Sequence, residues 1–312
     1  MSGDARRAGP DGYGRLMSIP TAAAPTQPTL AYALADARGQ LLAAERADHP
    51  FYAASTIKLH VLLAALQAAD GTEAGEDGPG DEPLLDLDQS VPATRTFLGA
   101  DGKPFTLGGD HLDATHPAER SPVTVRELLR RMIDRSSNEA TDHVLTLIGL
   151  DAVAEAIAGL GLSGTRVERL IGDAAAIERD LTNETTPADL VATVRALVAP
   201  HTGEGRGADG RGTWLSPSSR ELAREALAAQ QIPIIATALR PGVPVGSKSG
   251  WVDGYRHDVA VIGDPGAPAG QGSGAGHQEA RYLAVMTSGM GEAEADAAIR
   301  ERVRALLPQL AD

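Results

Sequence analysis

The sequence predicts an α+β fold, in which a five-stranded antiparallel sheet built from both chain ends is flanked by helices and joined to an all-helical part. Three observations predict it. Strand-like runs lie near the two ends, helical spacing with capping signals fills the middle, and an amphipathic helix closes the chain. The expected packing puts the terminal helices on one face of the sheet and the helical block on the other.

The N-terminal part begins with residues 1–28, which are rich in Gly, Pro and Ala and are expected to form a flexible lead-in. Two strands are predicted over Thr29–Ala35 and Leu41–Ala47, joined by a turn at 36–39. Apolar residues at helical spacing then predict a helix over Ser55–Ala69.

The middle of the chain carries helix-start signals. Thr124-Val125-Arg126-Glu127 is a capping box that opens a helix to about Arg135, and Ser136-Ser137-Asn138-Glu139 is a second box. A further helix is expected over Asp151–Ala158. The pair Thr186-Pro187 predicts the start of another, which runs through Val198.

The C-terminal part returns to strands after one more helix. The expected elements are a helix over Ser216–Gln230, strands over Pro244–Ser249, Asp258–Ile262 and Tyr282–Thr287, and a final helix over Ala293–Leu310. Solvated loops are expected at Asp70–Glu82, His201–Gly212 and Gly263–Gly276.

The chain is long enough for one large core, so residues 29–312 are predicted to form a single catalytic domain. Its α/β part is expected to comprise about 29–70 and 214–312, and its helical part about 84–200. The oligomeric state is not predicted.

Composition narrows the class of function. A formal net charge of −14 and a pI near 5.0 argue against nucleic acid or an anionic membrane as partner. The chain has no cysteine, and its eight histidines lack metal-site spacing, so neither metal nor cofactor is expected. No signal peptide is evident, and the apolar run Ile57–Leu66 is too short to cross a bilayer, which predicts a cytoplasmic protein.

Lysine is scarce, and its placement indicates chemistry. Of 28 Lys and Arg residues only three are lysines, namely Lys58, Lys103 and Lys248. Lys58 ends the motif Ser55-Thr56-Ile57-Lys58, and Lys248 opens the motif Lys248-Ser249-Gly250. An amine can be tuned to give up its proton, whereas a guanidinium cannot.

Three short motifs therefore carry candidate roles, although each has a simpler interpretation when taken alone. Ser55 with Lys58 is either a nucleophile with its base or a helix cap with a surface lysine. Ser136 is either a proton relay or a helix cap. Lys248 is either a carboxylate contact or the lysine of an edge strand, beside a Gly250 that lets substrate approach closely.

Taken together and in order, Ser-x-x-Lys, Ser-x-Asn and Lys-Ser-Gly resemble the motif set of class A β-lactamases and penicillin-binding proteins. The chain is similar to class A β-lactamase-like serine hydrolases over roughly residues 29–310. Further support comes from Thr185-Thr186-Pro187 and from the run His257-Asp258-Val259-Ala260-Val261. The resemblance implies a β-lactamase/transpeptidase-like fold.

The resemblance also implies a role for each residue. Ser55 is the implied nucleophile, Lys58 its activating partner, and Ser136 the proton donor to the leaving nitrogen. Asn138 is implied to bind a substrate amide, and Lys248 and Ser249 its carboxylate. The backbone N–H groups of Ser55 and Trp251 form the implied oxyanion hole. Arg256 is a candidate second carboxylate contact, or else a surface arginine.

The chain departs from the family in the loop before Thr186. Ile171 stands where class A enzymes place the glutamate that directs water at the acyl-enzyme, and Asn183 replaces an aspartate. Asp173 or Glu178 would substitute if the loop folds differently. Otherwise they are solvated acids. Ser137 replaces the central aspartate of the second motif.

The expected function is a β-lactamase-like serine hydrolase for small-molecule substrates, acylated at Ser55 by β-lactams or related amides and esters, with impaired deacylation. A D-alanyl-D-alanine-type carboxypeptidase or a small-ester esterase on the same fold is the alternative. A second alternative is a ligand-binding module without turnover, which Ile171 favours.

Overall fold

A computed structural model of the chain describes residues 25, 27–71, 83–109, 112–200, 215–266 and 279–312. Most of the expected lead-in and of the three expected solvated loops lies outside the described residues.

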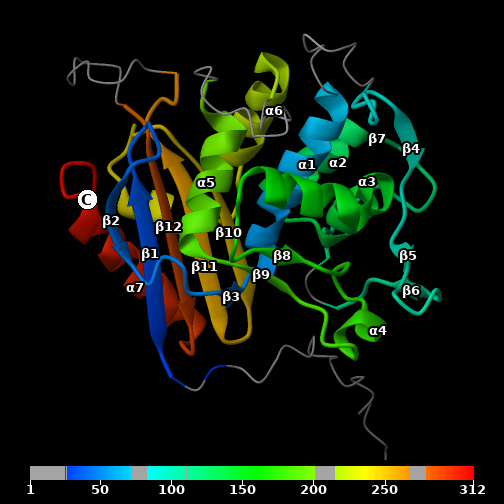
Figure 1. Cartoon of the computed structure of the whole chain (residues 1–312), viewed down its shortest axis with the longest axis horizontal. Coiled ribbons are helices and arrows are strands. Elements are labelled where there is room, and N and C mark those ends of the chain that lie inside the picture. Colours follow the sequence, from blue (N-terminus) through cyan, green and yellow to red (C-terminus); the bar gives the residue numbers. More distant parts are fainter. Residues whose placement is uncertain (1–24, 26, 72–82, 110–111, 201–214, 267–278) are drawn as a thin grey trace, which may run out of the picture.

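The main sheet has five strands and is antiparallel throughout, as predicted. Its order is β10-β11-β12-β1-β2, so the two chain ends meet where β12 pairs with β1 (Figure 1). The strands are β1 (Thr29–Ala35), β2 (Leu41–Glu45), β10 (Val245–Val252), β11 (Tyr255–Ile262) and β12 (Arg281–Ser288).

Strands β10 and β11 are longer than predicted. Their register runs from Val245↔Ile262 to Val252↔Tyr255 and ends at a tight turn with Gly254 at φ 81°. The sequence pattern did not show the full length of these strands, because polar residues interrupt it at Lys248-Ser249-Gly250 and Arg256-His257-Asp258. In the folded chain these side chains are buried and most have polar partners, so they do not interrupt the strands.

Helices cover both faces of the sheet. On one face, α7 (Glu292–Leu306) and the 3₁₀ turn η2 (Ile235–Ala238) pack over an apolar cluster that includes Leu34, Ile262 and Leu283. On the other, α5 (Pro187–Val198) lies across the strands and α1 (Lys58–Asp70) links the sheet to the helical part (Figure 1).

The helical part contains α2 (Val125–Asp134), α3 (Asn138–Gly159) and the short α4 (Ala174–Ile177), while α6 (Pro217–Ala228) packs against both α2 and the sheet strand β10. Three expected helix starts are confirmed, because the hydroxyls of Thr124, Thr186 and Ser216 each accept from a backbone N–H three residues on at 3.1 Å. The helical segment expected at Asp151–Ala158 is confirmed as the second part of α3, which follows a non-helical break at Gly149 with φ 81° and ψ 158°.

Short strand pairs were not predicted. They are β3 (Phe51–Tyr52) with β9 (Asn183–Thr185) and β8 (Arg166–Val167), β4 (Ser90–Pro92) with β7 (Pro122–Thr124), and β5 (Thr96–Leu98) with β6 (Pro104–Thr106). Two or three residues are too few to show a period. The β3-β9-β8 sheet ties the segment before Ser55 to the loop before Thr186.

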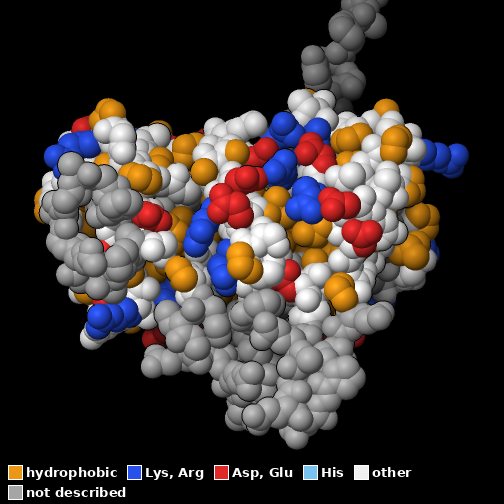
Figure 2. All heavy atoms as spheres, turned by 90° about the horizontal axis from the view of Figure 1, so that it is seen from above, with side chains coloured by type: hydrophobic (Ala, Val, Ile, Leu, Met, Phe, Trp, Pro, Cys, Tyr) orange, Lys and Arg blue, Asp and Glu red, His pale blue; other side chains and the backbone are white. Residues whose placement is uncertain are grey.

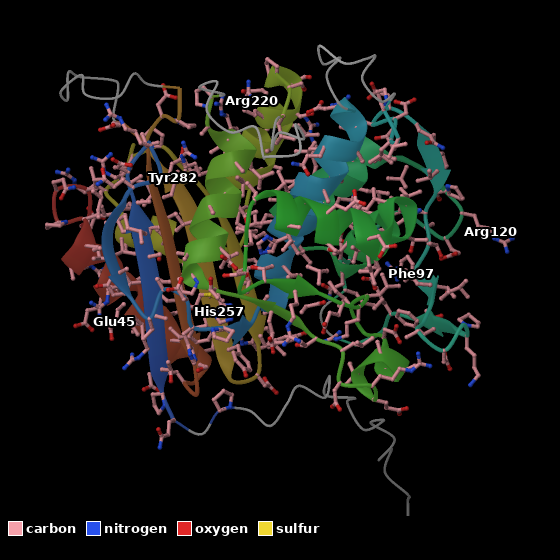
Figure 3. All side chains as sticks on the ribbon, in the orientation of Figure 1. Glu45, Phe97, Arg120, Arg220, His257 and Tyr282 are labelled. Carbon is pink, nitrogen blue, oxygen red and sulfur yellow. The ribbon has the colours of Figure 1, made fainter. Side chains whose placement is uncertain are left out.

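The molecular surface agrees with the argument from net charge against nucleic acid or an anionic membrane as partner. On the face shown in Figure 2, acidic and basic side chains are interspersed, without a continuous basic patch. No helix among the described residues is long and apolar enough to cross a membrane. Side chains fill the interior of the molecule, and the labelled residues mark its two sides: His257 lies on the sheet, whereas Phe97 lies on β5 at the far side of the helical part (Figure 3).

Candidate active site

Ser55 lies in a 3₁₀ turn, η1 (Ala54–Ile57), which leads directly into α1. The helix expected from Ser55 therefore begins as a 3₁₀ turn and becomes α-helical at Lys58. Ala54 is held at φ 47°, a left-handed conformation that is strained for alanine. Two backbone anchors flank it: Thr56 Oγ1 donates to Ala53 O at 2.6 Å, and Ala53 N donates to Asn183 O at 2.9 Å.

Lys58 is completely buried and has four polar neighbours. Its Nζ lies 3.1 Å from both Ser55 Oγ and Ser136 Oγ, 2.8 Å from Asn138 Oδ1 and 2.6 Å from Ser136 O. Burial lowers the pKa of Lys58 well below its usual value, and the charge of Lys248 lowers it further. A lysine so placed can hold its amine neutral beside a serine hydroxyl.

Ser136 joins this lysine to the second one. It adopts φ 57°, and its Oγ lies 3.0 Å from Lys248 Nζ. Ser136 is not the cap of α3, because Ser137 accepts from Ala140 N at 3.1 Å instead. The chain of contacts Ser55–Lys58–Ser136–Lys248 is thus continuous.

Lys248 is also completely buried, and its Nζ donates to Ser249 O at 2.6 Å. Burial lowers its pKa to about 7, Asp258 opposes this effect and Arg256 adds to it. Near neutral pH this amine is therefore poised between its charged and neutral forms.

Gly250 brings the edge strand β10 against the Ser55 turn. A Cβ at this position would lie 3.1 Å from Ala53 O, Thr56 N and Thr56 Cγ2. The expectation that Gly250 makes room for substrate is corrected here, because the space is taken by η1 of the protein itself. The missing side chain lets β10 and η1 pack closely enough to join the two motifs.

Comparisons with known proteins bear on this geometry. A model of a family described as "Beta-lactamase enzyme family" matches residues 21–271, most of the chain. The chain belongs to the β-lactamase enzyme family. No curated protein matches it.

Solved structures agree with the family assignment. A β-lactamase from Sphaerobacter thermophilus DSM 20745 is 25% identical, with a TM-score of 0.65 over 91% of this chain and 92% of the other. A β-lactamase from Xanthomonas campestris pv. campestris str. ATCC 33913 is 22% identical, with a TM-score of 0.65 over 91% and 92%. An ancestral (GNCA) class A β-lactamase is 22% identical, with a TM-score of 0.63 over 91% and 95%. This β-lactamase-like serine hydrolase thus has the α+β fold that its motifs implied.

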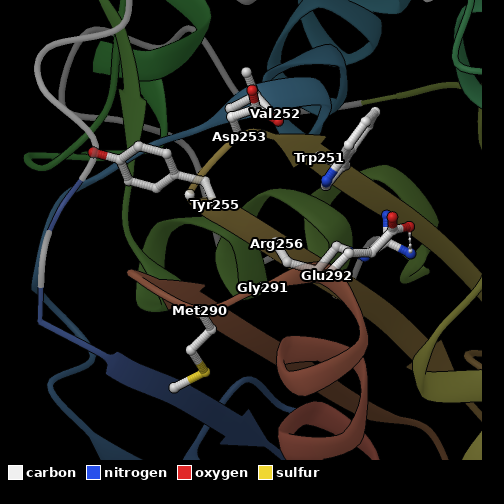
Figure 4. A pocket seen from close by; sticks show the side chains of 9 residues that line it. Trp251, Val252, Asp253, Tyr255, Arg256, Met290, Gly291 and Glu292 are labelled. Carbon is white, nitrogen blue, oxygen red and sulfur yellow. Dashed lines mark ion pairs between the residues drawn. The ribbon is translucent and has the colours of Figure 1, made fainter.

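The remaining predicted contacts of this β-lactamase family member lie further along β10 and β11. Ser249 is almost fully buried, whereas Trp251 is 39% exposed. Arg256 already has two acidic partners. Its Nε lies 2.7 Å from Asp296 Oδ1. Its Nη2 lies 3.5 Å from Glu292 Oε1 (Figure 4). Any substrate carboxylate would compete with these two acids for Arg256.

A hollow of about 140 Å³ lies at the β10–β11 turn, between Trp251, Arg256 and Glu292 (Figure 4). Ser55, Lys58 and Ser136 do not line it. The hollow therefore marks the end of the hairpin and not the nucleophile.

The loop before Thr186 is held by backbone contacts from Asn183. Asn183 Oδ1 accepts from Glu168 N at 3.0 Å, and its Nδ2 donates to Arg169 O at 3.1 Å. The Arg169 guanidinium donates to Tyr52 Oη at 3.0 Å and to Leu181 O at 3.1 Å. The asparagine thus fixes the loop without an ion pair to Arg169.

The two loop acids have different surroundings, and Asp173 is buried, not solvated as expected. Both oxygens of Asp173 accept from backbone amides, of Ala176 at 3.1 Å and of Ala100 at 2.8 Å, and Glu178 is exposed. Sequence reasoning missed a third carboxylate, Asp142, whose Oδ1 accepts from Ile171 N at 2.8 Å. Its signal was the spacing, since Asp142 follows Asn138 by four residues on one helix face.

Proposed function

We propose that the protein is a serine hydrolase acylated at Ser55 by β-lactams or by related amides and esters. The observation that supports it most is the unbroken chain of polar contacts from Ser55 Oγ through Lys58 and Ser136 to Lys248, with links of 3.0 to 3.1 Å. A buried, neutral-leaning amine beside a serine hydroxyl is how a weak nucleophile is activated.

The proposed acylation uses each residue at a stated atom. Ser55 Oγ attacks the substrate carbonyl while Lys58 Nζ takes its proton, and the N–H groups of Ser55 and Trp251 stabilise the oxyanion. Ser136 passes a proton to the leaving nitrogen. Asn138 binds the substrate side-chain amide, and Lys248 and Ser249 bind the carboxylate.

Deacylation is proposed to be slow. Position 171 offers no carboxylate, and the two loop acids have other partners or face solvent. Loss of a positioned base typically costs ~10²–10⁴-fold in rate. A β-lactam would then leave as a long-lived acyl-enzyme.

The test is to mix the purified protein with nitrocefin and follow colour release together with intact mass. A stoichiometric burst with a stable adduct supports acylation without deacylation. Sustained turnover that Ser55→Ala abolishes would contradict the slow-deacylation part. Absence of both adduct and turnover would contradict acylation by β-lactams.

A carboxypeptidase or small-ester esterase on this fold is the second candidate, which the lack of a carboxylate at Ile171 favours. Release of p-nitrophenol from short esters, without nitrocefin turnover, would support it. A ligand-binding module without turnover would reversibly bind substrate analogues and form no adduct.

A further inference from the structure

Arg256 lies beside Trp251 at the end of the β10–β11 hairpin. The two residues are directly opposite each other in the register, and Trp251 follows the glycine that packs on the Ser55 turn. Opposite residues of an antiparallel pair point to the same face of the sheet. Figure 4 shows Trp251 and Arg256 to one side of the hairpin and Tyr255 to the other. A guanidinium on this face suits a substrate carboxylate only when it has no acid of its own.

Two acids from α7 occupy the Arg256 guanidinium. Its Nε lies 2.7 Å from Asp296 Oδ1 and its Nη2 lies 3.4 Å from Asp296 Oδ2, so Asp296 binds it with both oxygens. Glu292 Oε1 lies 3.5 Å from the same Nη2. The Arg256 side chain is only 8% exposed, so water and salt screen these ion pairs little. A substrate carboxylate must therefore displace acids that are already in place.

The hollow beside Arg256 carries an excess of negative charge. Its charged lining residues are Asp253, Arg256 and Glu292, and this one cation with two acids gives a formal charge of −1. Asp296 adds a further acid, which Arg300 at 3.9 Å partly offsets. A carboxylate that enters the hollow would therefore meet net repulsion.

Exchange of one carboxylate for another gives Arg256 little net affinity for substrate. A guanidinium forms a bidentate pair with one carboxylate at a time. To bind substrate it must leave Asp296, whose side chain is only 21% exposed and would remain poorly hydrated and unpaired. The gain from the new ion pair is thus offset by the loss of the old one.

We propose that Asp296 and Glu292 are positioning residues that withhold Arg256 from the substrate and so determine specificity. Of the two cations considered for a substrate carboxylate, Lys248 alone is then left to bind it. The end of the hairpin instead favours substrates with an uncharged group beside Trp251, whose exposed indole offers an aromatic surface. This inference rests on the proposed function, since it concerns which amides and esters are accepted.

The first test compares benzylpenicillin with its methyl ester, in which the carboxylate is neutralised. The measured quantity is the ratio of their second-order rate constants for acylation, followed by intact mass. In Asp296→Asn the ratio should rise about tenfold or more in favour of the carboxylate, as expected for one new charge-assisted hydrogen bond. Glu292→Gln should raise it less, because the contact of Glu292 is longer and more exposed. An unchanged ratio in both variants would overturn the proposal.

Two further variants separate the release of Arg256 from the mere loss of a negative charge. Glu294→Gln removes an exposed acid from the same helix that is not among the described ion-pair partners of Arg256, so the ratio should stay unchanged. Arg256→Gln combined with Asp296→Asn should return the ratio to the wild-type value, because the gain needs the guanidinium. A gain that survives in this double variant would overturn the proposal. If Asp296→Asn does not fold, Glu292→Gln decides, alone and combined with Arg256→Gln.

A binding measurement separates this inference from the proposed function. Ser55→Ala lacks the proposed nucleophile, so the affinities of both compounds can be measured in it by calorimetry. When Asp296→Asn is added, the affinity for benzylpenicillin should rise and that for the methyl ester should not. If the wild type forms no adduct with either compound, acylation by β-lactams fails, and the binding ratio still decides the role of Asp296. Equal changes for both compounds, or no binding of either, would overturn that role.

Discussion

Ser136 and Ser137 are neighbours in sequence with separate tasks. Ser136 contacts both lysines from a left-handed conformation, whereas Ser137 caps α3 and donates to Glu139. The sequence placed both residues in the second motif. It assigned the cap to Ser136 because the spacing to Glu139 fits a capping box, and only backbone geometry separates the two roles.

Replacement of each serine should separate reactivity from stability. Ser136→Ala should slow acylation by ~10²–10⁴-fold, because the relay between the lysines and the leaving group is lost. Ser137→Ala should instead cost about 0.5–2 kcal/mol of unfolding free energy, because the cap is lost. Stopped-flow acylation and thermal unfolding of both variants check this, and equal effects on both readouts would contradict the assignment.

Lys248 should make carboxylate recognition depend on pH. Its pKa is lowered to about 7, so the ammonium is present below that pH and is lost as the pH rises through it. The KM for a penicillin should therefore increase above about pH 7. The KM for p-nitrophenyl acetate, which has no carboxylate, is the control and should not follow. Parallel profiles for both substrates would exclude Lys248 as the carboxylate contact.

At the scale of elements, the long helices and strands were predictable and their contacts were not. Capping hydroxyls at Thr124, Thr186 and Ser216 are local signals, and the structure confirms them. The packing of β10 on η1 joins residues far apart in sequence and depends on a missing side chain at Gly250. Asp142 was missed for the same reason, since its hydrogen-bond partner Ile171 belongs to another segment.

Gly250→Ala tests the packing of β10 on η1. The added Cβ would lie 3.1 Å from two backbone atoms, so the strand and the Ser55 turn must move apart. Overpacking of this kind typically costs ~1–3 kcal/mol. We expect a lower melting temperature together with slower acylation. Gly159→Ala, with nothing within 4 Å of the added Cβ at the end of α3, is the control and should lower neither.

At the scale of the whole molecule, a single sheet made from both chain ends followed from the position of the strand-like runs. The layering followed only in part, because α1 lies with α5 and α3 and not on the face of α7. Those runs can form one sheet only if the helical block is inserted between them, which is the arrangement of β12 beside β1. The buried polar groups between the layers could not be foreseen. Among them are His60, between Thr185 and Thr193, and His257, which contacts Tyr52 O at 2.9 Å.

These histidines should make stability fall in acid. Burial lowers the pKa of His60 to about 3 and of His257 to about 4, while the unfolded chain protonates near 6.5. Their contribution to the free energy of unfolding is fully present above about pH 6.5. Below that pH it falls by about 1.4 kcal/mol per histidine for each pH unit. Denaturant unfolding at about pH 7 and about pH 5 measures this. Between these two pH values, the unfolding free energy of His60→Gln should fall by about 2 kcal/mol less than that of the wild type. Equal decreases in both proteins would contradict the account.

The central claim is that Ser55 is the nucleophile, and mapping of a penicillin adduct tests it most directly. Trypsin should release residues 47–58 as one peptide, which contains Ser55 and ends at Lys58. We predict one adduct per chain, located on Ser55 within this peptide and absent from Ser55→Ala. An adduct on another residue, or an unmodified peptide after prolonged incubation with benzylpenicillin, would contradict the claim.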